Sequence, residues 1–137
     1  MKQEHKELLL KDLCARLPYN VAIDCKDEDS RFTCYLTTDI LREIQNNTCY
    51  WEYKPYLFPL SSMTEQQKEE LLYNYIHNDI YFDDFTDYFL AGELWHDLCI
   101  SMDILSESIN WLNKNHFDWR GLIPKGLAND ATGLNIY

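Results

Sequence analysis

The hydrophobic period changes twice along this chain, and these changes constrain the fold more than any other feature of the sequence. Residues 2–17 place leucines four residues apart, a pattern typical of an amphipathic helix that ends before Pro18. Residues 31–38 alternate between apolar and polar side chains, as a half-buried strand does. From residue 61 to residue 117 the helical period returns. This order predicts an α+β fold with an N-terminal helix, a small antiparallel sheet of three or four strands and about three C-terminal helices.

Turn residues divide the β region, residues 19–60, into segments of strand length. Residues 40–45 fit either a helix or a strand. The pair Asn46-Asn47 comes directly after them and is followed by an aromatic stretch, which favours a hairpin. We therefore predict that the strands form an antiparallel meander.

The helical region begins with a recognisable start signal. Thr64 and Gln67 have the spacing of a capping box, so we expect a helix to begin there. Further helices are predicted over residues 83–90 and 94–115, and the tail, residues 118–137, holds three of the four glycines and reads as turns. The buried positions of the last helix are predicted to be Leu98, Met102, Leu105, Ile109, Trp111 and Leu112.

The length and the cysteine content bound the class of protein. A chain of 137 residues fits one domain, which we place over residues 1–137. No apolar run is long enough for a membrane span or a signal peptide, which predicts a cytoplasmic protein. The five cysteines are odd in number and include no C-x-x-C pair, which favours reduced thiols. We accordingly expect no disulfide, no bound metal and no other cofactor.

Negative charge is concentrated in one part of the sequence. The formal net charge is −11, from 12 basic and 23 acidic residues, which argues against direct binding of nucleic acid. Residues 61–97 hold nine of the acids and one lysine, interleaved with aromatic residues. Such a segment is either a solvated face or an acidic surface that docks on a basic partner. In the second case the partner-binding residues are Asp79, Tyr81, Asp83, Asp84, Phe85, Asp87 and Tyr88.

Sequence motifs of the common catalytic sites are missing. The chain has no P-loop, no G-x-G-x-x-G, no G-x-S-x-G and no H-E-x-x-H, so we assign no catalytic residue and expect a protein that is not an enzyme. One alternative stays open. His96 and Cys99 are three residues apart and would share one face of a helix, where nearby carboxylates would complete a small metal-dependent or Cys/His enzyme.

Two stretches have a more distinctive amino-acid sequence than the rest of the chain. Residues 54–64 read K-P-Y-L-F-P-L-S-S-M-T, and residues 110–128 read N-W-L-N-K-N-H-F-D-W-R-G-L-I-P-K-G-L-A. Together they resemble a group of small uncharacterised proteins encoded by phages, prophages and other mobile elements of gut anaerobes. The chain departs from the group's usual pattern at three positions, with Asn115 in place of a second histidine, Phe58 in place of arginine and Pro124 in place of an acid. The resemblance implies a shared origin and fold, but no mechanism.

The sequence thus predicts a small acidic cytoplasmic protein of phage or mobile-element origin that binds another protein. The partner would be a host or phage protein, and a basic, nucleic-acid-binding protein suits an acidic surface best. The chain would then act as an inhibitor or as a mimic of nucleic acid. We expect no direct contact with nucleic acid or with a membrane.

Overall fold

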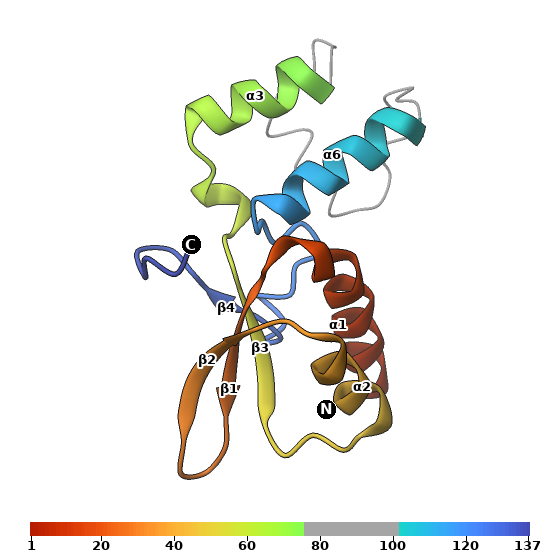
Figure 1. The fold of residues 1–137 in the computed structure, drawn as a ribbon. Coiled ribbons are helices and arrows are strands. Elements are labelled where there is room, and N and C mark those ends of the chain that lie inside the picture. The colour runs from red at the N-terminus through yellow and green to blue at the C-terminus, as the bar shows by residue number, and fades with distance from the viewer. Residues whose placement is uncertain (76–101) are drawn as a thin grey trace. The chain divides into compact units, whose positions relative to one another are not determined.

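The structure is a computed structural model of the chain and describes residues 1–75 and 102–137. The helix predicted at residues 83–90 lies outside the described residues. The chain forms two compact units. We call Met1–Leu57 with Leu122–Tyr137 the sheet unit, and Phe58–Gly121 the helical unit. The α+β class, the N-terminal helix and the small sheet are as predicted (Figure 1).

The N-terminal helix, α1, spans Gln3–Arg16 and confirms the prediction for residues 2–17. Leu9 and Leu13 bury its apolar side. A short 3₁₀ helix, η1 (Leu17–Tyr19), follows and contains Pro18, which cannot continue the α-helix. Asn20 then takes a left-handed conformation, with φ of 53°, and turns the chain into the sheet.

Strands β1 (Ala22–Lys26) and β2 (Arg31–Tyr35) form an antiparallel hairpin, in which Asp24 lies opposite Thr33. The side chain of Asp27 closes the connecting turn. Its Oδ1 accepts hydrogen bonds from the backbone N–H groups of Asp29 and Ser30, at 2.8 and 2.6 Å. Aspartate suits this position because its short carboxylate reaches the backbone two residues on.

The hairpin predicted after residue 40 is wrong, because these residues form helix α2 (Thr38–Asn46). Thr37 caps the helix by accepting a hydrogen bond from the N–H of Ile40 at 3.3 Å. Ile40 and Ile44, four residues apart, are both buried. Asn47, with φ of 54°, ends the helix in a Schellman motif rather than forming a hairpin turn.

The sheet has the strand order β2-β1-β3-β4 and is not a meander. Strand β3 (Glu52–Leu57) pairs antiparallel with β1, since α2 carries the chain across from β2 to the other side of β1. Strand β4 (Asn129–Asp130) pairs parallel with β3, so the sheet is mixed rather than wholly antiparallel. Strand β4 was not predicted, because a strand of two residues is too short to show a hydrophobic period.

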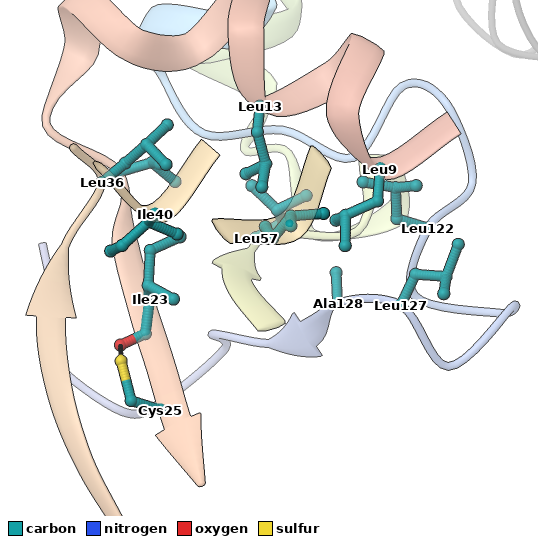
Figure 2. Close-up of a cluster of buried hydrophobic side chains, with 12 residues drawn as sticks. Leu9, Leu13, Ile23, Cys25, Leu36, Ile40, Leu57, Leu122, Leu127 and Ala128 are labelled. Carbon is teal, nitrogen blue, oxygen red and sulfur yellow. Dashed lines mark hydrogen bonds between the residues drawn. The ribbon is translucent and has the colours of Figure 1, made fainter. Parts of the chain in front are cut away.

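The core of the sheet unit lies between the sheet and the two helices. Leu9 and Leu13 from α1 pack with Ile23 and Leu57 from the strands, and Figure 2 shows this cluster from close by. The C-terminal segment completes the cluster with three further residues. These are Leu122, Leu127 and Ala128. The core therefore combines residues from both ends of the chain.

The opposite face of the sheet carries a buried carboxylate. Asp24 lies between two core-facing residues of β1, so its side chain points to the other face. It is 4% exposed and accepts hydrogen bonds from Nε and Nη2 of Arg31, at 2.8 and 2.9 Å, and from Nδ2 of Asn129 at 2.8 Å. Burial alone would raise the pKa of Asp24, but the hydrogen bonds from Arg31 and Asn129 outweigh it and the pKa is lowered.

The helical unit begins with η2 (Leu60–Ser62) and helix α3 (Glu65–Tyr75). The predicted capping box is confirmed. The N–H of Thr64 donates to Oε1 of Gln67 at 2.9 Å, and the N–H of Gln67 donates to Oγ1 of Thr64 at 3.2 Å.

The last helix, α6, spans Met102–Lys114. Trp111 and Leu112 are buried as predicted, at 6% and 0% exposure, while Ile109 is half-buried. The predictions for Leu98, Met102 and Leu105 lie outside the side chains that the structure describes. The ring of Trp111 stacks on that of Phe117, with centroids 5.8 Å apart. No helix within residues 1–75 and 102–137 has the length and apolar character needed to cross a membrane.

We expect Leu13→Ala to lower the free energy of unfolding by about 2–5 kcal/mol, because Leu13 is fully buried and its loss leaves a cavity. Leu134, which is 52% exposed, provides the matched control. Leu134→Ala should change stability by less than about 0.5 kcal/mol. Urea unfolding of the two variants measures the difference, and equal values would contradict the placement of Leu13 in the core.

A second prediction concerns the pH dependence of stability. Because folding lowers the pKa of Asp24, its carboxylate stabilises the fold above its unfolded pKa of about 3.9, and this contribution is lost as the pH falls through the lower, folded value. Asp24→Asn should lower the free energy of unfolding by about 1–3 kcal/mol at pH 7. The difference from the wild type should shrink below about pH 4.

Asp39→Asn serves as the control for this experiment, since Asp39 also pairs with an arginine, Arg42, but is 77% exposed. Its effect should stay below about 1 kcal/mol at every pH. A difference between Asp24→Asn and the wild type that is unchanged at pH 2.5 would show that the carboxylate charge of Asp24 is not what stabilises the sheet.

Candidate functional site

The residues predicted to bind a partner lie outside the described residues. They are Asp79, Tyr81, Asp83, Asp84, Phe85, Asp87 and Tyr88. His96 and Cys99, the centre of the alternative enzyme site, lie in the same stretch. Of the acidic segment at residues 61–97, the structure describes the beginning, which includes α3.

The described part of the acidic segment presents carboxylates to solvent. Glu65 and Glu69 on α3 are exposed and one helical turn apart, so they share a face. Lys68 pairs with Glu65 at 3.1 Å. Glu70 accepts a hydrogen bond from Nε1 of Trp111 at 3.1 Å, which ties α3 to α6. This beginning of the segment is therefore a solvated acidic helix face.

The two units differ strongly in charge. The helical unit contains twelve acidic and three basic residues, for a net charge of −9. The sheet unit contains eleven acidic and nine basic residues, for a net charge of −2. Nine of the eleven net negative charges of the protein thus belong to the helical unit.

The sheet unit contains a pocket of about 400 Å³. Its walls come from the N-terminus and the first half of α1, the end of α2, the loop that follows α2, the beginning of β3 and the turn at residues 125–127. Buried leucine and isoleucine side chains form its apolar part, namely Leu9, Ile44 and Leu127. The aromatic residues Trp51 and Tyr53 and the lysines Lys54 and Lys125 also line it. A volume of this size is typical of a small-molecule site.

Contacts with neighbouring residues fix both rings of the pocket. Trp51 packs edge-to-face against Phe32, with ring centroids 4.9 Å apart. The hydroxyl of Tyr53 donates to Oε2 of Glu43 at 2.6 Å. Burial raises the pKa of Tyr53, and the bond to Glu43 raises it further, so its hydroxyl stays protonated.

The turn on the other side of the pocket depends on Gly126. Its φ of 72° is strained for any residue with a side chain. The N–H groups of Gly126 and Leu127 close the turn by donating to the carbonyl oxygens of Ile123 and Leu122, at 3.0 and 2.9 Å. This turn places Lys125 at the pocket and Leu127 in the core.

The polar groups of the pocket are only partly satisfied. Lys54 forms an ion pair with Glu52 at 3.2 Å. The side chains of Lys125 and His5 make neither an ion pair nor a hydrogen bond within the part of the chain that the structure describes. Both therefore remain able to bind a group that enters the pocket.

The structure brings together the two stretches that carry the resemblance, residues 54–64 and 110–128. In the sheet unit, Lys54 from the first and Lys125 from the second line the same pocket. In the helical unit, the N–H of Phe58 donates to the carbonyl of His116 at 2.8 Å, and the N–H of Asp118 donates to the carbonyl of Phe58 at 2.8 Å. The two stretches are thus joined within each unit.

Four cysteines lie in the described residues, and all four are free thiols. Cys14 and Cys49 are exposed, whereas Cys25 is buried and its Sγ lies 3.0 Å from that of Cys34. Burial raises the pKa of Cys25 to about 12, and the contact with Cys34 acts in the same direction. Burial, assisted by Glu43, also raises the pKa of Cys49. Within residues 1–75 and 102–137, no group of three or more His, Cys, Asp or Glu side chains could hold a metal ion.

Comparisons with known proteins found no relative of this chain. No protein-family model matches the chain, and neither does any curated protein or any solved structure.

Sequence reasoning missed the pocket and its two lysines. Lys54 and Lys125 are 71 positions apart in sequence, and no motif connects them. The one usable signal was the glycine at position 126, which predicts a tight turn and so places its neighbours at a fixed point.

The thiol environments predict an order of alkylation by iodoacetamide at pH 8. Cys14 should react first and Cys49 more slowly, while Cys25 should react only when the protein unfolds. Peptide mass spectrometry at successive times measures this order. Rapid modification of Cys25 in the folded protein would contradict its burial.

Proposed function

We propose that this protein is a non-enzymatic binding module that docks onto another protein through its acidic aromatic segment, residues 61–97. The contact residues in this proposal are Asp79, Tyr81, Asp83, Asp84, Phe85, Asp87 and Tyr88. The partner is a host or phage protein with a basic surface. A nucleic-acid-binding protein has such a surface, and the chain would then inhibit it by occupying the groove for phosphates.

The charge distribution is the observation that carries this proposal. Nine acids and one lysine fall within 37 consecutive residues, and the helical unit carries −9 of the net −11. Solubility alone would be served by the same charges spread over both units. Concentrating them on one unit creates a local field, which speeds association with a basic partner and orients it.

The aromatic residues of the segment support a protein contact over simple solvation. Tyr81, Phe85 and Tyr88 occur among the carboxylates. Large rings beside charged groups supply the apolar anchors on which binding energy concentrates in protein interfaces. Phosphate groups of nucleic acid, in contrast, need lysine and arginine, which this segment does not provide.

We further infer that the protein is cytoplasmic and that it originates from a mobile element. The resemblance of residues 54–64 and 110–128 to phage and prophage proteins supports the origin. The odd number of cysteines supports a reducing compartment.

The test begins with affinity capture from the native host, followed by association kinetics with the captured partner at two salt concentrations. Raising the salt should slow association, because exposed charges are screened over about 8 Å at physiological ionic strength. The triple variant Asp83→Asn, Asp84→Asn, Asp87→Asn should associate more slowly and lose most of this salt dependence. Tyr81→Ala and Phe85→Ala should instead speed dissociation.

A charge-matched control separates local charge from net charge. The triple variant Glu28→Gln, Asp29→Asn, Asp39→Asn removes three exposed acids from the sheet unit. It should leave association close to that of the wild type. A partner whose association ignores both salt and the Asp83/Asp84/Asp87 substitutions, or responds equally to both triple variants, would overturn the proposal.

A further inference from the structure

We propose that the pocket of the sheet unit binds a small organic anion. In this assignment an apolar body of aromatic size occupies the pocket, and an oxyanion, a carboxylate or a phosphate, pairs with Lys125. The site is separate in the chain from the acidic segment, and its residues belong to the sheet unit.

The interior of the pocket suits an apolar body. Leu9, Ile44 and Leu127 are 1%, 3% and 8% exposed and belong to the main core cluster, so this part of the pocket is continuous with the core. Figure 2 shows Leu9 and Leu127 close together in that cluster. An apolar ligand group placed against them is removed from water in the same way as a core side chain.

The aromatic walls are held in place before any ligand binds. Phe32 packs against the ring of Trp51, and Glu43 holds the hydroxyl of Tyr53. Rings that are already fixed lose little conformational freedom on binding, which favours affinity. Flat rings at fixed positions also favour a flat ligand body, through stacked or edge-to-face packing.

The charge at the pocket favours an anion over a neutral or cationic ligand. Glu52 is the one acid among the lining residues, and Lys54 neutralises it at 3.2 Å. Lys125 then leaves an unbalanced positive charge, and His5 adds a second group able to donate a hydrogen bond. This local excess of positive charge occurs in a chain whose net charge is −11. An ammonium group binds carboxylate and phosphate alike, because it acts as a point charge.

The test uses three probes with one body and different head groups: 2-naphthoate, 2-naphthamide and 2-naphthyl phosphate. Each is titrated into the full-length ¹⁵N-labelled protein and followed by two-dimensional NMR. We expect 2-naphthoate or 2-naphthyl phosphate to bind with a Kd of about 1 mM or below. The neutral 2-naphthamide should bind at least about three-fold more weakly. The tighter of the two anions identifies the preferred oxyanion.

The location of the site is tested in the same spectra. Signals of the Gly126 and Leu127 amides and of the Trp51 indole should shift with saturation. Shifts confined to other residues would overturn the assignment, and so would the absence of binding at millimolar concentrations of all three probes.

Two substitutions separate the charge from the apolar body. Lys125→Gln should weaken binding of the better anion by about three- to five-fold and leave 2-naphthamide unchanged. Lys11→Gln is the matched control, since Lys11 is an exposed lysine of the same unit that does not line the pocket. Trp51→Leu should weaken the anion and the amide together, because it removes a wall that both share.

The proposal fails if 2-naphthoate, 2-naphthyl phosphate and 2-naphthamide bind equally well, since the pocket would then select an apolar group alone, such as a side chain of a partner protein. It also fails if Lys125→Gln and Lys11→Gln have the same effect. The dispersion of the NMR spectrum shows whether each variant is folded. A folded Lys125→Gln variant is expected, because Lys125 is exposed.

Discussion

The pairing of the C-terminal segment with β3 is the interaction on which the rest of the structure depends. In the sheet unit, β4 lies parallel to β3, and the N–H of Ala131 donates to the carbonyl of Leu57 at 2.8 Å. In the helical unit, Phe58 exchanges backbone hydrogen bonds with His116 and Asp118. Consecutive residues, Leu57 and Phe58, thus join both units to the returning chain. The 64 residues of the helical unit form the intervening connection, and the core of the sheet unit is complete only when Leu122 and Leu127 arrive from its far end.

Charge is divided between the units in a way that permits two opposite kinds of recognition. The helical unit, at −9, would suit the basic partner proposed above, while in the sheet unit, at −2, Lys54 balances Glu52 and Lys125 leaves one pocket with a positive excess. Interactions between exposed charges fall off within about 8 Å at physiological ionic strength. The charge next to a site therefore determines its selectivity more than the net charge of the protein does.

Local signals were predictable from the sequence, and long-range pairings were not. The capping box at Thr64 and Gln67 and the end of α1 before Pro18 depend on neighbouring residues, so the sequence contains the whole signal. Helix α2 was misassigned because Asn47 can end a helix as readily as it can form a hairpin turn, and only burial of Ile40 and Ile44 against the sheet decides between them. Strand β4 and the pocket depend on which distant residues meet, and a single sequence does not record this.

The pocket and the core share residues, and this sharing links ligand binding to stability. Leu9, Ile44 and Leu127 are buried members of the core and also line the pocket. A ligand that packs against them binds the folded sheet unit and not the unfolded chain, so it stabilises that unit by an amount that grows with the logarithm of its concentration once this exceeds Kd. A partner protein bound through residues 61–97, as proposed, would stabilise the helical unit by the same principle. Each kind of binding would thus favour the pairing with the returning chain within its own unit, through Leu57 in the sheet unit and through Phe58 in the helical unit.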